Sequence, residues 1–262
     1  MIGFDLSHYQ TAGQLARAIH SGDFVFVKAT EGTNYVDPEH DIDIAAIRAA
    51  KRIAGHYHFA RDVGAAYAEA QWFLDHANPQ SGDLVALDLE SMNGSWTGRA
   101  AYAVAWLTFV QQATGAVGFR YMNRSWYDAL ESAASGVLDR WPLWIATGGM
   151  PAGQPGVTGW VIHQWSTAAG IDHDVTSRDL WPYSVPSTDP KPPVPPTPLE
   201  PRVFWFRVTL PGCPEADFSY DGVNEYRWLA KGDKDGLIAA GVKQVPAPTF
   251  LATMHLNGPR PA

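Results

Sequence analysis

Residues 84–90 read LVALDLE, four apolar residues that lead into Asp88 and Glu90, with one leucine between the two carboxylates. A continuous apolar run without alternation is typical of a strand that is covered on both faces, as in a parallel sheet. Residues two apart in a strand point to the same face, with Cα atoms roughly 7 Å apart. The stretch therefore predicts a buried strand that ends in two carboxylates on one face.

Six further apolar runs of this kind occur along the chain. They are IGFD at 2–5, FVFVK at 24–28, IAGHYHF at 53–59, FRYM at 119–122, LWIA at 143–146 and WVIHQW at 160–165. Helix-like stretches with recurring Ala separate the first five strands of the series, at 12–21, 39–51, 64–77 and 98–114. Strand–helix alternation at a spacing of roughly 30 residues indicates an α/β barrel or a doubly wound sheet.

The spacing of the strands changes after residue 146. Thirteen residues rich in Gly and Pro separate LWIA from WVIHQW, and only five lie between Trp165 and Ile171. Parallel strands need a crossover of about a dozen residues or more, usually with a helix. We therefore predict an α/β fold, a TIM-like irregular β/α barrel of about five βα units, closed by helix-poor strands of which some run antiparallel.

A Pro-rich segment divides the chain. Residues 186–201 contain eight Pro in 16 positions, which favours an extended polyproline II spacer over a helix or a central strand. We predict a main domain over 1–185, a linker over 186–201 and a small module over 202–262. The module begins with an alternating apolar stretch and has a helix-like stretch at 233–242, which predicts an α+β or β-rich fold.

Charge and composition restrict the classes of partner. Residues 1–185 hold 11 Lys and Arg against 19 Asp and Glu, whereas a nucleic-acid surface needs clustered positive charge. This acidic balance leads us to expect no nucleic-acid partner. No run of about 18 apolar residues exists, so we also expect no membrane insertion. The single Cys213 supports neither an intramolecular disulfide nor a thiolate metal cluster. His56 and His58 are expected to form hydrogen bonds rather than to bind zinc, so no metal or other cofactor is predicted.

Polar residues collect where the predicted strands end. They are Asp5, Glu31, Tyr57, His58, Asp88, Glu90, Tyr121 and Gln164. In α/β barrels, functional residues lie at the C-terminal ends of the strands. Two neighbouring carboxyls tend to have separated pKa values, so that one remains a proton donor, and glycoside hydrolysis needs such a pair. The spacing alone is weak evidence, because Asp37-Pro38-Glu39 shares it; there we expect a solvated loop before a helix.

Six ordered motifs together resemble the glycoside hydrolase family 25 lysozymes, the Chalaropsis-type muramidases. The motifs are GFDLSHYQ at 3–10, FVKATEGTNYVDP at 26–38, GHYHFAR at 55–61, LDLE at 87–90, LWIA at 143–146 and HQWS at 163–166. The resemblance covers roughly residues 1–183, in order and at plausible spacings. The family 18 chitinases, a related barrel, are disfavoured because their DxxDxDxE strand is absent.

The resemblance implies roles for individual residues. Glu90 is expected to be the general acid, Asp88 to stabilise the substrate's own acetamido group, and Asp5 to support them. A fourth carboxylate falls in IDHDV at 171–175, where we choose Asp172 and keep Asp174 as the competitor. The residues expected to bind substrate are Tyr57, Tyr121, Gln164, Trp165 and Glu31.

The implied activity is hydrolysis of the β-1,4 bond between N-acetylmuramic acid and N-acetylglucosamine in peptidoglycan. With residues 202–262 as a cell-wall-binding module and no signal peptide before Ile2-Gly3-Phe4, we expect a monomeric phage endolysin. It would stay in the host cytoplasm until released to the wall. One alternative is a secreted bacterial autolysin whose leader was removed. The other is a non-catalytic glycan-binding or virion structural protein, which the intact Asp5, Asp88 and Glu90 disfavour.

Overall fold

The computed structural model describes residues 1–186, 204–210, 213–220 and 226–228. The chain divides into two units, Met1–Asp189 and Pro190–Ala262. In the second unit, β10 (Phe204–Leu210), β11 (Cys213–Tyr220) and β12 (Tyr226–Trp228) form a three-stranded antiparallel sheet. The predicted Pro-rich linker, apart from Pro186, and the helix-like stretch at 233–242 lie outside the described residues, so both stay predictions.

The first unit is a closed β/α barrel. Its strands are β1 (Ile2–Leu6), β2 (Phe24–Glu31), β3 (Tyr35–Val36), β4 (Ile53–Phe59), β5 (Leu84–Asp88), β6 (Phe119–Asn123), β7 (Leu143–Ala146), β8 (Trp160–Ala168) and β9 (Ile171–Val175). All except β3, which forms a short hairpin with β2, lie side by side in one sheet that closes through the pairing of β1 with β2. Strand β9 is antiparallel to both β1 and β8, while the other barrel pairs are parallel. The predicted irregular barrel with antiparallel closing strands is confirmed.

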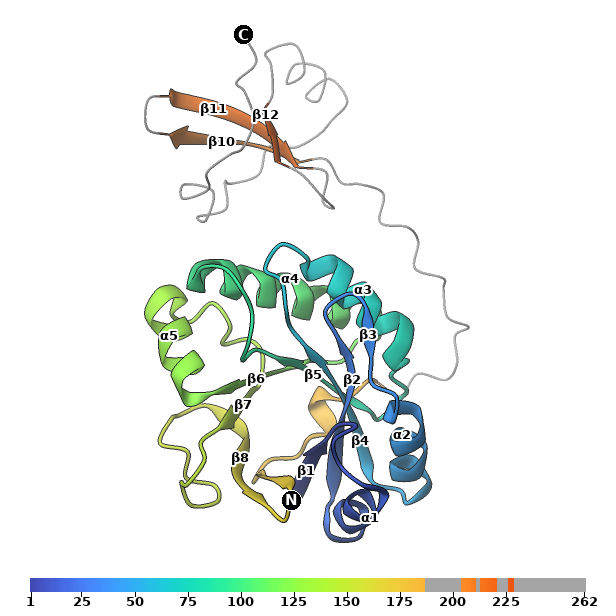
Figure 1. Ribbon diagram of the computed structural model, residues 1–262. Coiled ribbons are helices and arrows are strands. Elements are labelled where there is room, and N and C mark those ends of the chain that lie inside the picture. The colour runs from blue at the N-terminus through green and yellow to red at the C-terminus, as the bar shows by residue number, and fades with distance from the viewer. Residues whose placement is uncertain (187–203, 211–212, 221–225, 229–262) are drawn as a thin grey trace. The chain divides into compact units, whose positions relative to one another are not determined.

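Five helices surround part of the barrel (Figure 1). They are α1 (Ala12–Ser21), α2 (His40–Ala49), α3 (Ala66–Ala77), α4 (Trp96–Thr114) and α5 (Arg124–Ala134). The first four correspond to the helix-like stretches in the sequence, and α5 completes the five βα units. Asn123, the last residue of β6, caps α5 by accepting a hydrogen bond from the Trp126 N–H. Within the described part of the chain, no helix combines the length and the apolar character needed to cross a membrane.

Large aromatic rings fill the barrel interior toward the N-terminal ends of the strands. Phe24 and Phe26 on β2 point inward with Trp144 and Phe119, while the alternate residues of β2 pack against α1 and α2. A Cβ atom on Gly3 would lie 2.1 Å from the Phe24 ring, so β1 must carry a glycine where that ring crosses it. This part of the interior is therefore packed, and the room for a ligand lies at the C-terminal ends of the strands.

The N-terminal end of the barrel is covered by the last described segment of the first unit. A single 3₁₀ turn, Trp181–Tyr183, places the Tyr183 ring edge-on against Phe119, with ring centroids 5.3 Å apart. Backbone hydrogen bonds join this segment to the residues just before β5 and β6, including Val117 N to Tyr183 O at 3.1 Å. One end of the barrel is thus closed, and the C-terminal ends of the strands are left open.

Candidate active site

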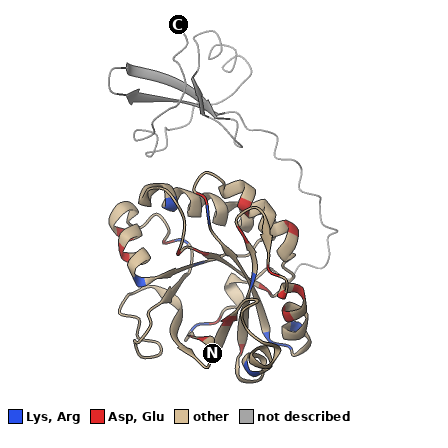
Figure 2. Ribbon diagram, in the orientation of Figure 1, with Lys and Arg blue, Asp and Glu red and all other residues tan. Residues whose placement is uncertain are grey.

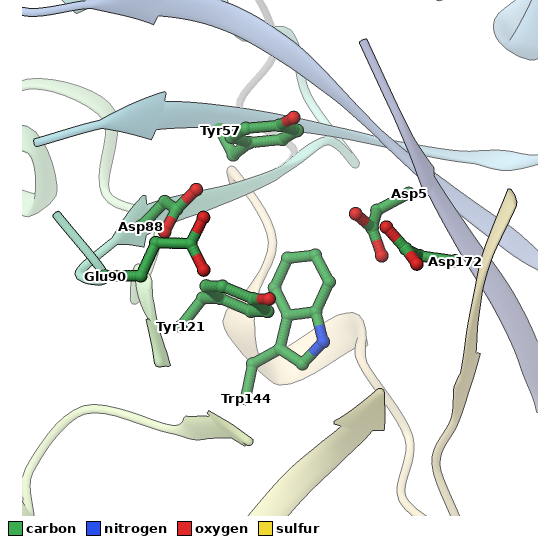
Figure 3. A pocket seen from close by; sticks show the side chains of 7 residues that line it. All are labelled: Asp5, Tyr57, Asp88, Glu90, Tyr121, Trp144 and Asp172. Carbon is green, nitrogen blue, oxygen red and sulfur yellow. The ribbon is translucent and has the colours of Figure 1, made fainter. Parts of the chain in front are cut away.

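A small cleft of about 110 Å³ opens at the C-terminal ends of the strands. Its lining residues are Asp5, Tyr57, Asp88, Glu90, Tyr121, Trp144 and Asp172. Figure 3 shows Asp88 and Glu90 together on one side and Asp5 and Asp172 together on the other, with the rings between them. The predicted carboxylates therefore come together in one cleft.

Asp88 and Glu90 point into the cleft because the strand pairing continues past Asp88. The Leu89 N–H donates to Tyr121 O at 2.9 Å, and the Ala60 N–H donates to Asp88 O at 3.1 Å. Leu89 is fully buried in the layer between the barrel and the helices, so the residues on either side of it face the interior. Asp88 and Glu90 thus lie on one face of the strand, as their spacing in the sequence predicts.

Asp5 and Asp172 face each other across the pairing of β1 with β9. Gln164 on β8 holds this side of the cleft: its Nε2 donates to Asp5 Oδ2 at 2.8 Å, and its Oε1 accepts from the Tyr121 hydroxyl at 3.0 Å. The Thr167 hydroxyl donates to Asp172. The positions of Asp5 and Tyr121 are therefore fixed by one amide that lies behind them.

The two carboxyls at the end of β5, those of Asp88 and Glu90, differ in burial. Asp88 is 6% exposed, and its Oδ1 is buried without a hydrogen-bond partner among the described residues. Burial, and then the neighbouring Glu90, raise the pKa of Asp88 well above its usual range. Glu90 is partly exposed, and burial followed by the charge of Asp172 raises its pKa. A raised pKa keeps a proton available for donation at higher pH, which a general acid requires.

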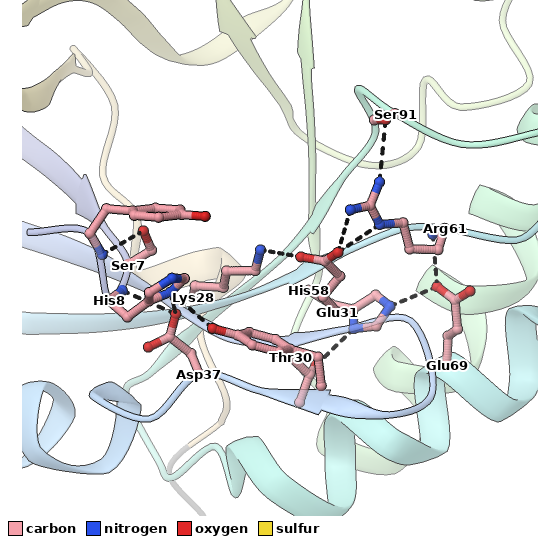
Figure 4. Close-up of polar contacts among 12 residues, drawn as sticks. Ser7, His8, Lys28, Thr30, Glu31, Asp37, His58, Arg61, Glu69 and Ser91 are labelled. Carbon is pink, nitrogen blue, oxygen red and sulfur yellow. Dashed lines mark hydrogen bonds and ion pairs between the residues drawn. The ribbon is translucent and has the colours of Figure 1, made fainter.

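A cation beside the cleft opposes these shifts (Figure 4). Lys28 on β2 lowers the pKa values of both Asp88 and Glu90 by its charge. Lys28 Nζ donates to Glu31, and Arg61 Nε donates to the other oxygen of Glu31 at 2.7 Å. Burial acts to raise the pKa of Glu31, but these hydrogen bonds outweigh it and lower the pKa overall. Glu31 thus holds Lys28 beside the cleft, and its own charge acts to raise the pKa of Asp88.

The two strand histidines form hydrogen bonds behind the barrel wall, as the sequence suggested. His58 joins the Thr30 hydroxyl at 2.8 Å to Glu69 at 2.9 Å, and Glu69 accepts the backbone N–H of Arg61 at 3.1 Å (Figure 4). His56 lies between His40 at 2.8 Å and Asp83 at 3.1 Å. In the part of the chain that the structure describes, no group of three or more His, Cys, Asp or Glu is placed to hold a metal ion.

The structure separates the predicted substrate-binding residues into two groups. Tyr57 and Tyr121 line the cleft. Gln164 lies behind it, Glu31 lies beside Lys28, and Trp165 is half-buried with its ring centroid 6.0 Å from that of His173. Direct contact of these three residues with substrate stays a prediction.

Trp144 is a lining residue that sequence reasoning missed, although LWIA was one of the motifs. Its indole ring packs edge-on against Tyr121, with ring centroids 4.9 Å apart, and tilted against Phe26 at 4.6 Å. The available signal was a single large aromatic in an otherwise aliphatic strand. Only 2% of Trp144 is exposed, so the ring forms the floor of the cleft and presents little of its face to a ligand.

The prediction of a solvated loop at 37–39 is wrong for Asp37, which is buried. Asp37 is 2% exposed and accepts hydrogen bonds from the backbone N–H of His8 at 3.1 Å and from the His8 ring at 2.9 Å. It is buried because it ties the loop after β1 to the start of α2. Glu39 is exposed, as expected.

The carboxylates in the cleft are a local concentration of charge. Figure 2 shows Lys and Arg positions dispersed among Asp and Glu around the first unit. Four of the seven lining residues are acidic, and they come from β1, β9 and the residue pair at the end of β5. Such a cluster is costly to bury and is typical of catalytic sites that shift pKa values.

An α/β barrel that gathers acidic side chains around a cleft at its strand ends has the arrangement that a glycoside hydrolase needs. The chain belongs to the glycosyl hydrolases family 25, which its residues 4–174 match. It is a glycoside hydrolase of the muramidase, or lysozyme, class, and its activity is peptidoglycan hydrolysis.

Three relatives illustrate the similarity. The N,O-diacetylmuramidase of Chalaropsis sp is 34% identical over 182 residues, which span 60% of this chain and 85% of that protein. The structure of a muramidase from Trichobolus zukalii is 26% identical, with a TM-score of 0.59 over 69% of this chain and 95% of that one. The crystal structure of the CTP1L endolysin is 26% identical, with a TM-score of 0.56 over 69% of this chain and 67% of that one.

Proposed function

We propose that the enzyme cleaves the β-1,4 bond between N-acetylmuramic acid and N-acetylglucosamine in peptidoglycan, with Glu90 as the general acid. The observation that carries the proposal is the unlike pair at the end of β5. Glu90 is partly exposed at the cleft and has a raised pKa, whereas only 6% of Asp88 is exposed. One carboxyl is suited to deliver a proton and the other to accept a hydrogen bond.

In the first step, Glu90 donates its proton to the glycosidic oxygen as the bond from that oxygen to the anomeric carbon breaks. The acetamido oxygen of the same N-acetylmuramic acid attacks the anomeric carbon and forms a cyclic oxazolinium ion. The cleft-facing oxygen of the Asp88 carboxylate accepts the acetamido N–H, and the carboxylate stabilises the positive charge of the ion. The substrate's N–H favours the ionised form of Asp88, which burial disfavours in the empty cleft.

In the second step, the Glu90 carboxylate takes a proton from water, whose oxygen attacks the anomeric carbon. The bond from that carbon to the acetamido oxygen breaks, and the acetamido group is restored. Two displacements at one carbon retain the anomeric configuration, whereas a single attack by water inverts it. NMR of the first product tests this step: retention supports assistance by the substrate, and inversion contradicts it.

Digestion of purified peptidoglycan followed by mass spectrometry tests the bond itself. We expect fragments that carry N-acetylmuramic acid at a new reducing end. Reducing-end N-acetylglucosamine would assign the enzyme to the other glycosidic bond. Retention of glycan by the protein without release of any fragment would instead favour the non-catalytic alternative.

We further propose that the enzyme is a monomeric phage endolysin that remains in the host cytoplasm until released to the wall, and that residues 202–262 bind the wall. The likeness to the CTP1L endolysin supports this role. Expression in the cytoplasm of a susceptible bacterium tests it. We expect lysis only when a separate membrane pore is co-expressed; export and lysis without the pore would favour a secreted autolysin.

A further inference from the structure

Asp174 is a buried carboxyl that does not line the cleft. It lies on β9 two residues after Asp172, opposite Gly3 on β1 and Gln164 on β8. Its side chain therefore points into the barrel on the same face as Asp172, one layer further from the opening. Only 1% of the residue is exposed.

Each oxygen of Asp174 has a different environment. Oδ1 accepts the indole N–H of Trp144 at 2.8 Å. Oδ2 is buried and receives no N–H or hydroxyl donor from the described residues. Asp5 lies two residues after Gly3 on the same face of β1, so its carboxyl is the diagonal neighbour of Asp174, and the two carboxyls affect each other's pKa. Two carboxyls can form a hydrogen bond with each other only when one of them carries a proton.

Both carboxyls of the pair have raised pKa values. Burial, and then the charges of Asp174 and Asp172, raise the pKa of Asp5 well above its usual range. Burial also raises the pKa of Asp174, to about 7. The pair therefore keeps a proton at a pH where an exposed aspartate has lost its own. The titratable groups that face the pair are Asp172, Tyr57, Tyr121, Asp88 and Glu90.

We propose that Asp174 is a positioning residue for the hydrolysis: it shares a proton with Asp5 and so holds Asp5 in a single orientation, while the Trp144 indole N–H anchors Asp174. Gln164 holds Asp5 with a second hydrogen bond of 2.8 Å. Asp5 is thus held from two sides. The proposal rests on the proposed function for its catalytic part, but not for the shared proton.

The shared proton can be tested without substrate by following the Trp144 indole in a ¹⁵N-labelled protein. Because Trp144 donates to Asp174, its Nε1–H resonance should titrate with a midpoint near 7. Trp144→Phe assigns the resonance. In Asp174→Asn, whose side-chain oxygen can still accept the indole N–H, the resonance should persist and the titration should vanish. A Trp144 resonance that does not titrate between pH 6 and 8 in the parent (roughly one unit either side of the expected midpoint) would overturn the proposal.

The catalytic part is tested by the pH dependence of kcat and KM on soluble peptidoglycan fragments. In Asp174→Asn the amide donates to Asp5 without a shared proton, so any part of the pH profile of kcat that follows the indole midpoint should be lost. At its own optimum this variant should retain kcat within roughly threefold, with KM little changed. Asp174→Leu removes both the acceptor for Trp144 and the partner of Asp5, and should lose kcat by about tenfold or more at every pH.

Asp43→Asn is the matched control. Asp43 is another buried carboxyl with a raised pKa, of about 6, but it lies on α2 away from the cleft. It should leave the pH profile of kcat unchanged. If Asp174→Asn matches this control in its profile, Asp174 has only a structural role. If the parent itself releases no fragments, the proposed function fails, while the indole titration still decides whether the proton is shared.

Discussion

At the scale of single residues, the chemistry depends on a contrast between neighbours that share one strand end. Asp88 and Glu90 are alike in charge, but one is enclosed and the other reaches the opening of the cleft. Burial raises the pKa of both groups, and Lys28 opposes the rise. A proton donor and an acceptor for the acetamido group can therefore stand side by side.

Glu90→Gln keeps the size of the side chain and removes the proton. We expect the rate of release of reducing ends from peptidoglycan to fall by about 10²–10⁴-fold, with the melting temperature not lowered. Glu39→Gln is the matched control, because Asp37-Pro38-Glu39 has the same spacing and Glu39 is exposed away from the cleft. Equal rates for Glu90→Gln and the parent would remove Glu90 from the role of acid.

Lys28→Met removes the cation that lowers the pKa values of Asp88 and Glu90. The acid form of Glu90 should then persist to higher pH, so the alkaline limb of kcat/KM should move upward, by up to about one unit. Glu31 keeps Arg61 as a partner in this variant. A limb that stays in place, or moves to lower pH, would show that Lys28 does not set the protonation of Glu90.

At the scale of strands and helices, the sequence predicts positions better than it predicts register. The continuous apolar runs and Ala-containing stretches locate the strands and four helices, since each pattern is local. Helix α5 is harder to detect because Leu130 is its one buried residue among those described. Trp144 joins the cleft because β6 and β7 align it with Tyr121, and no local pattern contains that alignment.

Register also decides between the two aspartates of IDHDV. Both point into the barrel, but the pairing of β1 with β9 sets Asp172 opposite Asp5, at the opening. Asp174 lies one layer deeper, with Trp144. The sequence resemblance left two candidates for the fourth carboxylate of the cleft. The strand pairing places one of them at the opening and the other below it.

Close packing of rings between strands makes Gly3 a sensitive position. Gly3→Ala places a Cβ atom 2.1 Å from the Phe24 ring in the present packing, so the ring or the strand must move. We expect a loss of about 1–3 kcal/mol in the free energy of unfolding, measured by urea denaturation. Gly148→Ala, with nothing within 4 Å of its added Cβ, should change stability little. Equal stabilities would mean that the interior can rearrange around the ring.

At the scale of the whole molecule, the division into Met1–Asp189 and Pro190–Ala262 separates two proposed tasks. All the lining residues of the cleft belong to the first unit. A protein that ends at Asp189 should therefore keep its kcat/KM on soluble fragments within about twofold, but should sediment less with intact cell walls. A truncated protein that binds walls as well as the full chain would remove the binding role from residues 190–262.

The position of β1 has a consequence for how the barrel forms during synthesis. The first strand to leave the ribosome pairs on one side with β2 but on the other with β9, where Ile2 is opposite Val175. One edge of β1 therefore stays unpaired until nearly the whole unit has been made, so closure is a late, long-range step. A nascent chain stopped before β9 should remain protease-sensitive throughout, because no smaller part of the ring can close on itself.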